Sequence, residues 1–353
     1  MWSWLLPAAA IVLLVLGLII HVTPILATLC GAALIGAVIS AVHHAEVIAH
    51  RVGEPFGTLV LTVSITVIEV GLIVMLMLGA EVDKAALPRD TIFSSIMIIC
   101  NAVVGLCLLI GGLRYREQTF HVLGANSALA VLIALSTLTL VLPAFTTSSA
   151  GPTYTEPQLI FAALTSLALW VTFVLIQTVH HRDYFLPVDN KADEHIHAPP
   201  PSARLAWTSL GLLFVTLIAV VGLAKVIGHS VETGLKAAGA PDKVLGIVVA
   251  MLVLLPETWA AVRAAHANRL QTSLNLALGS SLSSIGLTIP AVAVVSTVVD
   301  IPLVLGLEPK ELVLLVLTFV VASITLVTGR THALLGAVHL VIFAAFLFLA
   351  IVP

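Results

Sequence analysis

Charged side chains are scarce in this sequence. Lys, Arg, Asp and Glu together make up 9% of its 353 residues, whereas hydrophobic residues make up 60%. The surface of a soluble globular domain needs roughly a quarter charged residues, so this composition excludes that class. We expect an all-α membrane protein whose helices cross the bilayer many times.

Cysteines and N-terminal basic residues are also few. The three cysteines, Cys30, Cys100 and Cys107, lie inside expected spans without paired spacing. This indicates packing residues rather than a disulfide framework or a CxxC metal site. No Lys or Arg precedes the first apolar run, which therefore lacks the basic region of a cleaved secretory signal. We expect this run to be a retained first helix.

Long apolar runs dominate the rest of the chain. At about 20 residues per span, they predict eleven transmembrane helices. The expected spans lie near residues 4–20, 24–42, 56–79, 91–113, 125–143, 158–178, 206–227, 244–266, 272–298, 309–327 and 332–352.

A Pro-rich, charged segment at about residues 180–205 divides the chain near its centre. We expect an N-terminal helix at 1–22, a five-helix repeat at 23–179, this segment as a cytoplasmic linker, and a second five-helix repeat at 206–353. An odd number of helices in each repeat inserts the second repeat upside down relative to the first. Inverted repeats are typical of secondary transporters, whose substrate site lies near the bilayer midplane between the repeats.

Basic residues are biased toward one side of the membrane. With eleven spans, nine Lys and Arg residues fall on the side of the N-terminus and six on the other side. The positive-inside rule then places the N-terminus in the cytoplasm and the C-terminus on the periplasmic or external side.

Two glutamates lie near the middle of corresponding apolar runs. Glu69 lies 13 residues after the expected helix start at 56, and Glu257 lies 13 residues after the start at 244. An ionised carboxylate at the bilayer centre costs about 3 kcal/mol or more, so it needs a proton, a cation or a partner. A buried carboxyl group can hold a proton near neutral pH, whereas a bound cation favours the charged form. One site that binds either protons or a cation is sufficient for antiport if it faces each side in turn.

Oxygen-bearing groups near these glutamates complete the expected cation site. Pro256 precedes Glu257 and frees the carbonyl group of Leu252 from its helix hydrogen bond. Ca²⁺ takes about six to eight oxygen ligands, and Na⁺ takes fewer. The helix after each glutamate offers small polar side chains, namely Asn275, Ser280, Ser281, Ser283 and Ser284 in one, and Ser94, Ser95 and Asn101 in the other. The alternative is a proline kink with a glutamate that only hydrogen-bonds a neighbouring serine.

Two further residues are candidates for roles away from this centre. Glu54 lies 15 residues before Glu69, or about 22 Å along a helix, so it either gates the cytoplasmic entrance or caps a helix N-terminus. His339 lies inside the last expected span, where it belongs either to a proton path or to a hydrogen bond with a helix neighbour. Both alternatives stay open for each residue.

Several stretches together resemble one transporter family. They are Gly53 to Thr58 (GEPFGT), Thr66 to Glu69 (TVIE), Leu255-Pro256-Glu257, Asn275 to Ser284 (NLALGSSLSS), and Thr328 to Thr331 (TGRT) with His339. The chain resembles the ChaA-type calcium, sodium and potassium/proton antiporters of the Ca²⁺/cation antiporter superfamily over about residues 25–350. The resemblance implies that Glu69 and Glu257 are the paired acidic metal ligands of two repeats, and that Gly279, Ser280, Ser283 and Ser284 form the small-polar motif of the second. It also implies a bacterial cytoplasmic (inner) membrane location.

The chain departs from the pattern of the vacuolar Ca²⁺/H⁺ exchangers in one respect. Three residues before its glutamates it has Thr66 and Leu254, where that pattern has asparagine. Two amide oxygens are therefore missing, which leaves room for Na⁺ or K⁺ beside Ca²⁺.

We therefore expect a secondary antiporter, not an enzyme, that exchanges cytoplasmic Ca²⁺, Na⁺ or K⁺ for external H⁺ by alternating access. Its partners would be the lipid bilayer, inorganic cations and protons, with no nucleic acid and no cofactor. A passive channel would also use acidic residues, but one acid in each inverted repeat favours alternating access. A lipid-phosphate enzyme would need clustered basic residues or Asp-rich Mg²⁺ motifs. The residues expected to bind cations and protons are Glu69, Glu257, Asn275, Ser280, Ser284, Thr66 and Ser95.

Overall fold

The protein is described by a computed structural model that covers residues 2–53, 56–78, 85–186, 201–241, 243–300 and 303–352, with the backbone alone at 56–59. Within these residues, eleven helical segments are long and apolar enough to cross a membrane. They are Trp2–Ile19, Pro24–Val52, Val60–Leu78, Leu87–Tyr115, Val122–Ala144, Glu156–His180, Ala203–Ala237, Lys243–His266, Leu270–Val299, Pro309–Leu326 and Ala333–Ile351. The predicted all-α membrane protein with eleven spans is confirmed.

The chain forms two compact units, and each takes segments from both halves of the sequence. The first comprises Met1–Leu87 and Glu194–Val253, and the second comprises Pro88–Asp193 and Leu254–Pro353. The compact units are defined by contacts in space, whereas the expected repeats are defined by their order along the chain. The units therefore do not test the two five-helix repeats, which stay a prediction. Part of the predicted linker at 180–205 lies outside the described residues.

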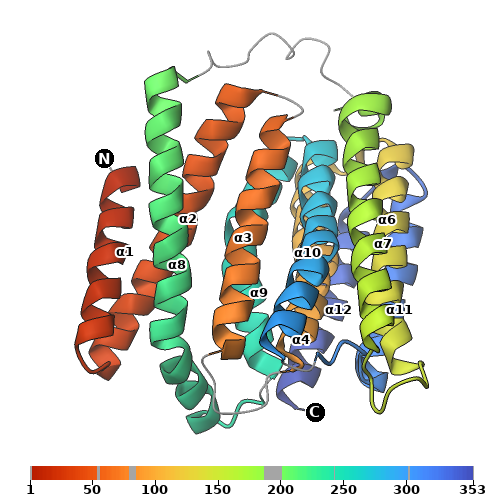
Figure 1. Ribbon diagram of the computed structural model, residues 1–353. Helices are drawn as coiled ribbons and strands as arrows, with labels where there is room; N and C mark the ends of the chain where they lie inside the picture. The colour runs from red at the N-terminus through yellow and green to blue at the C-terminus, as the bar shows by residue number, and fades with distance from the viewer. Residues whose placement is uncertain are drawn as a thin grey trace. The chain divides into compact units, whose positions relative to one another are not determined.

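The first unit is built around a long helix that contacts three others. It contains α1 (Trp2–Ile19), α2 (Pro24–Val52), α3 (Phe56–Leu78), α8 (Ala203–Ala237) and the first part of α9 (Lys243–His266). The helix α8 packs along α2 and also contacts α1 and α3 (Figure 1).

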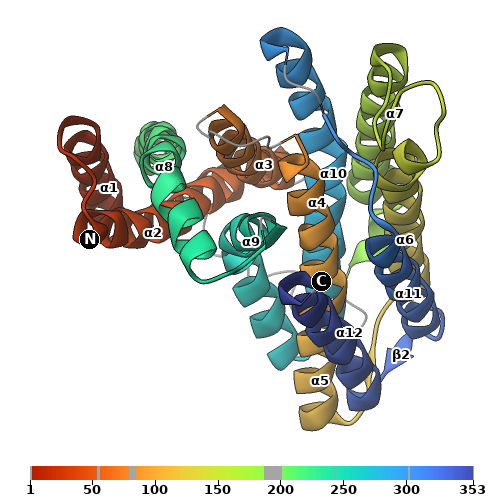
Figure 2. The same cartoon turned by 90° about the horizontal axis from the view of Figure 1, so that it is seen from below.

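The second unit contains the remaining helices. They are α4 (Leu87–Met97), the π-helical turn η1 (Ile98–Val103), α5 (Val104–Tyr115), α6 (Val122–Ser136), the π-helical turn η2 (Thr137–Val141), the 3₁₀ turn η3 (Leu142–Ala144), α7 (Glu156–Leu175), the π-helical turn η4 (Ile176–His180), the 3₁₀ turn η5 (Arg182–Phe185), the end of α9, α10 (Leu270–Val299), α11 (Pro309–Leu326) and α12 (Ala333–Ile351). The helix α10 packs against α6 and α7, and α12 packs against α5 (Figure 2). Gly336 allows this second contact, because an added Cβ atom there would overlap the backbone of Leu109.

Local sequence explains where several helices begin. In front of α7, the side chains of Thr155 and Gln158 form a capping box, and the Thr155 N–H donates to Gln158 Oε1 at 2.9 Å. In front of α11, the Glu308 N–H donates to Glu311 Oε2 at 3.0 Å in the same arrangement. These side chains satisfy N–H groups that the first helical turn leaves without a partner.

Two short strands were not predicted. The strand β1 (Gln118–Thr119) follows α5 and pairs antiparallel with β2 (Arg330–Thr331), which precedes α12. A strand of two residues is too short to show an alternating hydrophobic pattern, so only the structure reveals it.

Two helices run about ten residues beyond their predicted ends. The helix α2 continues from the predicted end at 42 to Val52, and α8 continues from 227 to Ala237. The hydropathy pattern predicts that both spans end where His, Lys and Glu side chains begin. These residues are nevertheless compatible with helix. The helix α2 ends at Gly53, which has a positive φ of 76°.

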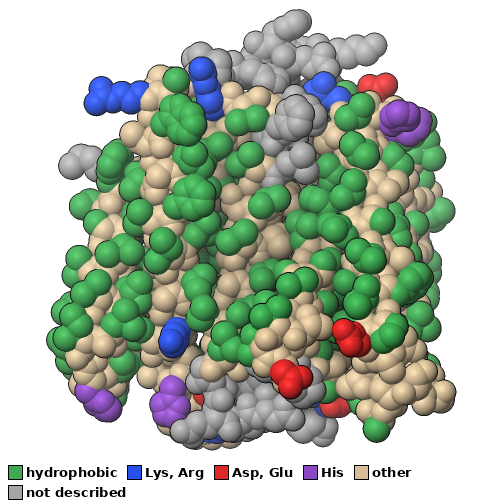
Figure 3. Space-filling view, viewed as in Figure 1, with side chains coloured by type: hydrophobic (Ala, Val, Ile, Leu, Met, Phe, Trp, Pro, Cys, Tyr) green, Lys and Arg blue, Asp and Glu red, His purple; other side chains and the backbone are tan. Residues whose placement is uncertain are grey.

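The distribution of side chains fits a bilayer. Figure 3 shows hydrophobic side chains over the middle of the visible helices and charged side chains near their ends. Large apolar residues such as Trp207 and Phe214 on α8 and Phe161 on α7 are exposed. Lipid tails can cover such surfaces because the helices satisfy their own backbone hydrogen bonds.

Candidate cation-binding site

A hydrogen bond joins one of the two predicted glutamates to a serine on the next helix. The Ser280 hydroxyl of α10 donates to Glu257 Oε1 of α9 at 2.9 Å. The helix α9 continues through Pro256, although proline cannot donate the usual backbone hydrogen bond. The Thr258 hydroxyl donates to the Leu254 carbonyl oxygen at 2.7 Å in the same turn. The structure thus brings Glu257 and Ser280 together as a carboxylate and hydroxyl pair. Both the cation site and the alternative of a hydrogen-bonded glutamate at a proline kink predict this contact, so Glu257 and Ser280 stay predicted ligands.

The serines that follow Ser280 are buried in the second unit. Ser283 and Ser284 are 8% and 5% exposed. Ser283 accepts a hydrogen bond from the indole Nε1 of Trp170 on α7 at 3.1 Å and donates to the Gly279 carbonyl oxygen at 2.9 Å. Ser284 stays a predicted ligand, and Trp170 is a neighbour that the sequence did not indicate.

Asn275 lies nearer the start of α10 and has other partners. Its Nδ2 donates to the Phe185 carbonyl oxygen at 2.6 Å, and its Oδ1 accepts from Gln271 Nε2 at 2.9 Å. Five residues separate it from Ser280, which is about 7.5 Å along the helix. Its described contacts therefore fasten α10 to η5, and its role as a cation ligand stays a prediction.

The other glutamate lies in the first unit. Glu69 on α3 is buried, with 2% of its surface exposed. Thr66, one turn earlier, is 7% exposed, and its hydroxyl donates to the Thr62 carbonyl oxygen at 3.0 Å. A hydroxyl that donates within its own helix keeps oxygen lone pairs for a cation. Both residues remain predicted ligands.

The polar residues of the span Leu87–Tyr115 separate into two groups. Ser94 and Ser95 are buried on α4, at 2% and 1% exposed, and the Ser94 hydroxyl donates to the Asp90 carbonyl oxygen at 2.6 Å. Asn101 lies in η1 and is fully buried. Ser95 stays a predicted ligand, whereas Asn101 belongs to a separate network.

That network surrounds His339 on α12. His339 Nδ1 lies 3.2 Å from Asn101 Oδ1, and its Nε2 lies 3.1 Å from the Thr325 hydroxyl of α11. Asn101 Nδ2 donates to the Thr318 hydroxyl at 2.9 Å. Because an amide oxygen only accepts, Nδ1 carries the proton in this arrangement and a neutral ring accepts at Nε2. The hydrogen-bonding alternative for His339 is thus observed, with partners on two other segments, and the proton path stays a prediction.

Two acidic residues, Glu54 and Asp90, lie near expected helix ends. Glu54 lies outside the described residues, so its capping and gating alternatives stay predictions. Asp90, in the first turn of α4, pairs with the adjacent Arg89, whose Nη2 lies 2.7 Å from Asp90 Oδ1. Arg89 Nη1 also donates to the Gly306 carbonyl oxygen at 3.2 Å, so this pair ties α4 to the segment before α11.

The acidic groups of the described chain do not gather into a cluster that could hold a metal. No group of three or more His, Cys, Asp and Glu side chains with suitable spacing is found among the residues that the structure describes. Ca²⁺ and other hard cations also bind oxygens of hydroxyl groups, carbonyl groups and water.

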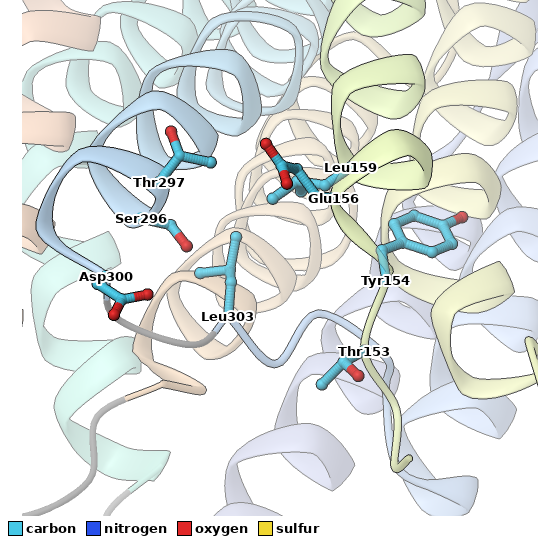
Figure 4. Close-up of a pocket in the computed structure, with 8 residues that line it drawn as sticks. All are labelled: Thr153, Tyr154, Glu156, Leu159, Ser296, Thr297, Asp300 and Leu303. Carbon is cyan, nitrogen blue, oxygen red and sulfur yellow. The ribbon is translucent and has the colours of Figure 1, made fainter. Parts of the chain in front are cut away.

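A separate pocket of about 400 Å³ lies where α7 begins and α10 ends (Figure 4). Glu156, Ser296, Thr297 and Asp300 line it together with Tyr154. The Tyr154 hydroxyl donates to the Leu138 carbonyl oxygen at 2.6 Å, and burial raises the pKa of this phenol above its usual range. Asp300 is 20 residues from Ser280, or about 30 Å along α10, so this pocket is distinct from the Glu257 pair.

Several partner residues were missed in the sequence. Trp170, Thr318 and Thr325 look like ordinary residues of apolar helices, and their partners lie 14 to 217 residues away along the chain. The signal available was an aromatic or hydroxyl side chain inside a span, which is too common to single out a functional contact.

Comparison with known proteins extends these observations. The family described as sodium/calcium exchanger protein matches residues 22–179 and 208–352. The putative ionic transporter y4hA of Sinorhizobium fredii is 44% identical over 100% of this chain and 96% of its own length. The sodium-potassium/proton antiporter ChaA of Escherichia coli is 36% identical over 98% of this chain and 94% of its own length. A solved structure of native YfkE has a TM-score of 0.76 at 19% identity, with 99% of this chain and 100% of that chain covered, which shows a shared fold.

Proposed function

This chain belongs to the sodium/calcium exchanger protein family, and we propose that it exchanges cytoplasmic Ca²⁺, Na⁺ or K⁺ for external protons across a bacterial inner membrane. The observation that carries the proposal is the Glu257 carboxylate inside a transmembrane helix, held at 2.9 Å by the Ser280 hydroxyl. A carboxylate at this depth is costly unless it binds a proton or a cation. The names of the family and of the ChaA relative support the three cations and the proton as transported ions.

The Glu257 pair suits both ions in turn. In the charged state, the carboxylate accepts a hydrogen bond from the Ser280 hydroxyl, and charge-assisted hydrogen bonds of this kind are strong. An arriving cation is neutralised by the carboxylate, and the Ser280 hydroxyl can rotate so that its oxygen faces the ion. When a proton binds the carboxylate instead, the cation loses its neutralising charge and leaves. Competition for one carboxylate thus couples the two fluxes.

Glu69 supplies the second carboxylate of the proposal. It is buried, at 2% exposed, and Thr66 offers a hydroxyl oxygen one turn away. Its position in the other unit fits a carrier in which both units contribute to transport. The proposed topology places the N-terminus and the 180–205 linker in the cytoplasm and the C-terminus outside.

Proton release from acidified vesicles tests the proposal. Inverted vesicles that contain the protein are acidified, and Ca²⁺, Na⁺ and K⁺ are added separately while a pH-gradient dye is followed. At least one cation should dequench the dye between pH 7 and 9, and vesicles without the protein should not respond. A cation gradient should also drive protons against their own gradient, which a passive channel cannot do. Absence of coupled proton movement with all three cations would refute the function.

A further inference from the structure

A tryptophan on α7 hydrogen-bonds one serine of α10 close to the Glu257 pair. The Trp170 indole Nε1 donates to Ser283 Oγ at 3.1 Å, and the two side chains are 7% and 8% exposed. The ring also lies against Gly286, where an added Cβ atom would be 2.6 Å from Trp170 Cβ. The helices α7 and α10 pack side by side in both ribbon views (Figures 1 and 2). Packing and a hydrogen bond therefore fix the position of the tryptophan together.

The Ser283 hydroxyl is occupied by two partners. Its proton is donated to the Gly279 carbonyl oxygen at 2.9 Å, and its oxygen accepts the indole N–H. A hydroxyl has one proton and two lone pairs, so both the proton and one lone pair are in use. The indole N–H also presents its positive end to this oxygen, where it would oppose the approach of a cation. Ser283 is thus poorly placed to be a cation ligand while Trp170 is present.

Ser280 lies three residues before Ser283 on the same helix. This separation corresponds to about 60° around α10 and about 4.5 Å along it, so the two hydroxyls are neighbours. The Ser280 hydroxyl donates to the Glu257 carboxylate at 2.9 Å, whereas the Ser283 hydroxyl accepts a hydrogen bond from Trp170 of α7. The two adjacent serines therefore have different tasks because only one of them has a tryptophan partner.

We propose that Trp170 is a positioning residue that sets cation specificity by withholding the Ser283 oxygen from the cation site. The inference rests on the proposed exchange at Glu257. Ca²⁺ needs about six to eight oxygen ligands and a monovalent cation needs fewer, so one withheld oxygen disfavours Ca²⁺ more. Trp170 thereby biases the site toward monovalent cations.

The substitution Trp170→Phe removes the indole N–H and keeps an aromatic ring against Gly286. Half-saturating concentrations for proton release are measured with Ca²⁺ and with the monovalent cation that the wild type exchanges. Where Ca²⁺ alone releases no protons, its inhibition of the monovalent exchange gives the constant instead. The preference for Ca²⁺ should rise by roughly threefold to tenfold, the size of one net hydrogen bond. The matched control is Trp207→Phe, since Trp207 is 73% exposed on α8.

A second pair of variants separates specificity from simple loss of packing. Ser283→Ala should keep the wild-type ratio of the two constants, because the wild-type site does not use this oxygen. In the double variant Trp170→Phe/Ser283→Ala the ratio should return to the wild-type value, because the released oxygen is gone. The inference is overturned if Trp170→Phe leaves the ratio unchanged, if Ser283→Ala alone shifts it, or if the double variant keeps the shift. Failure of the wild type to exchange any cation would instead refute the proposed function.

Discussion

The charge of Glu257 provides the most direct test of the cation site. The substitution Glu257→Gln keeps the length of the side chain. The amide oxygen of the glutamine can still accept a hydrogen bond from the Ser280 hydroxyl, which lies 2.9 Å from Glu257 Oε1 in the wild type. The amide carries no charge and cannot bind and release a proton. Loss of one partner of a buried charge pair costs about 3–5 kcal/mol, which corresponds to a roughly hundredfold to several thousandfold weaker affinity. Exchange should therefore disappear at millimolar cation concentrations.

Glu257→Asp gives an intermediate case that separates charge from reach. It keeps the charge but withdraws the carboxylate by about one carbon–carbon bond, roughly 1.5 Å, beyond hydrogen-bond distance of Ser280. A cation held by the other ligands would then lie about 1.5 Å farther from the carboxylate, and at an effective dielectric constant of about 20 this weakens their attraction by about 2 kcal/mol. The half-saturating cation concentration should then rise by between about tenfold and a hundredfold, with exchange still measurable.

Dye dequenching in inverted vesicles measures both variants, and size-exclusion profiles in detergent confirm that they are folded. The control is Glu232→Gln near the end of α8, because Glu232 forms an (i, i+4) pair at 2.8 Å with Lys236, whose side chain is half exposed, and such helix pairs contribute little. It should exchange cations normally. Near-normal exchange by Glu257→Gln, or equal loss in Glu257→Gln and Glu257→Asp, would refute the proposed role of the charge.

Four further predictions follow from the same site and topology. Glu69→Gln should abolish exchange in a folded protein, and normal proton release would reduce Glu69 to a structural role. A reporter that fluoresces only in the cytoplasm should stay dark when fused after the last residue, whereas a bright fusion would contradict the external C-terminus. Below the pKa of the site, where protons and the cation compete, the half-saturating cation concentration should fall about tenfold for each unit by which the pH rises. A constant half-saturating concentration from pH 6.5 to 9 would show a separate proton path. Asn101→Leu should cost about 1–3 kcal/mol of stability because it removes the amide oxygen that lies 3.2 Å from His339 Nδ1. The thermal midpoint should fall for Asn101→Leu but not for the exposed Thr172→Val, and equal midpoints would contradict the network.

The number and order of the spans could be predicted because each depends on a local property. A run of about 20 apolar residues crosses a bilayer whatever its neighbours are, so hydropathy located all eleven segments. The ends of α2 and α8 could not be located in this way, since polar helical turns that project beyond the apolar run have no hydropathy signal. The strand pair at Gln118 and Thr331 depends on residues more than 200 positions apart, which no local pattern encodes.

The candidate site likewise contains residues that could be predicted from the sequence and contacts that could not. Glu257 and Ser280 could be predicted because an acid and a small polar residue inside apolar helices are conspicuous, and the structure places them in contact at 2.9 Å. The partners of Asn275 could not be predicted, since its amide is held by Gln271 and the Phe185 backbone. A side-chain oxygen on a polar helix face can bind a cation only if other groups do not already hydrogen-bond it. The tertiary packing decides which oxygens have such partners, and the sequence does not show it.

We expect the part of the second unit around the buried His339 network to move least during transport. This network joins η1, α11 and α12 through side chains that are fully buried, and both ring nitrogens of His339 have partners. Separating these helices would leave several polar groups unsatisfied in an apolar interior, at a cost of about 1–3 kcal/mol each. The hydrogen bond between Glu257 and Ser280 is different, because a cation or a proton can replace it. We therefore expect the exchange cycle to remake the contacts of Glu257 while the helices around His339 move as one block.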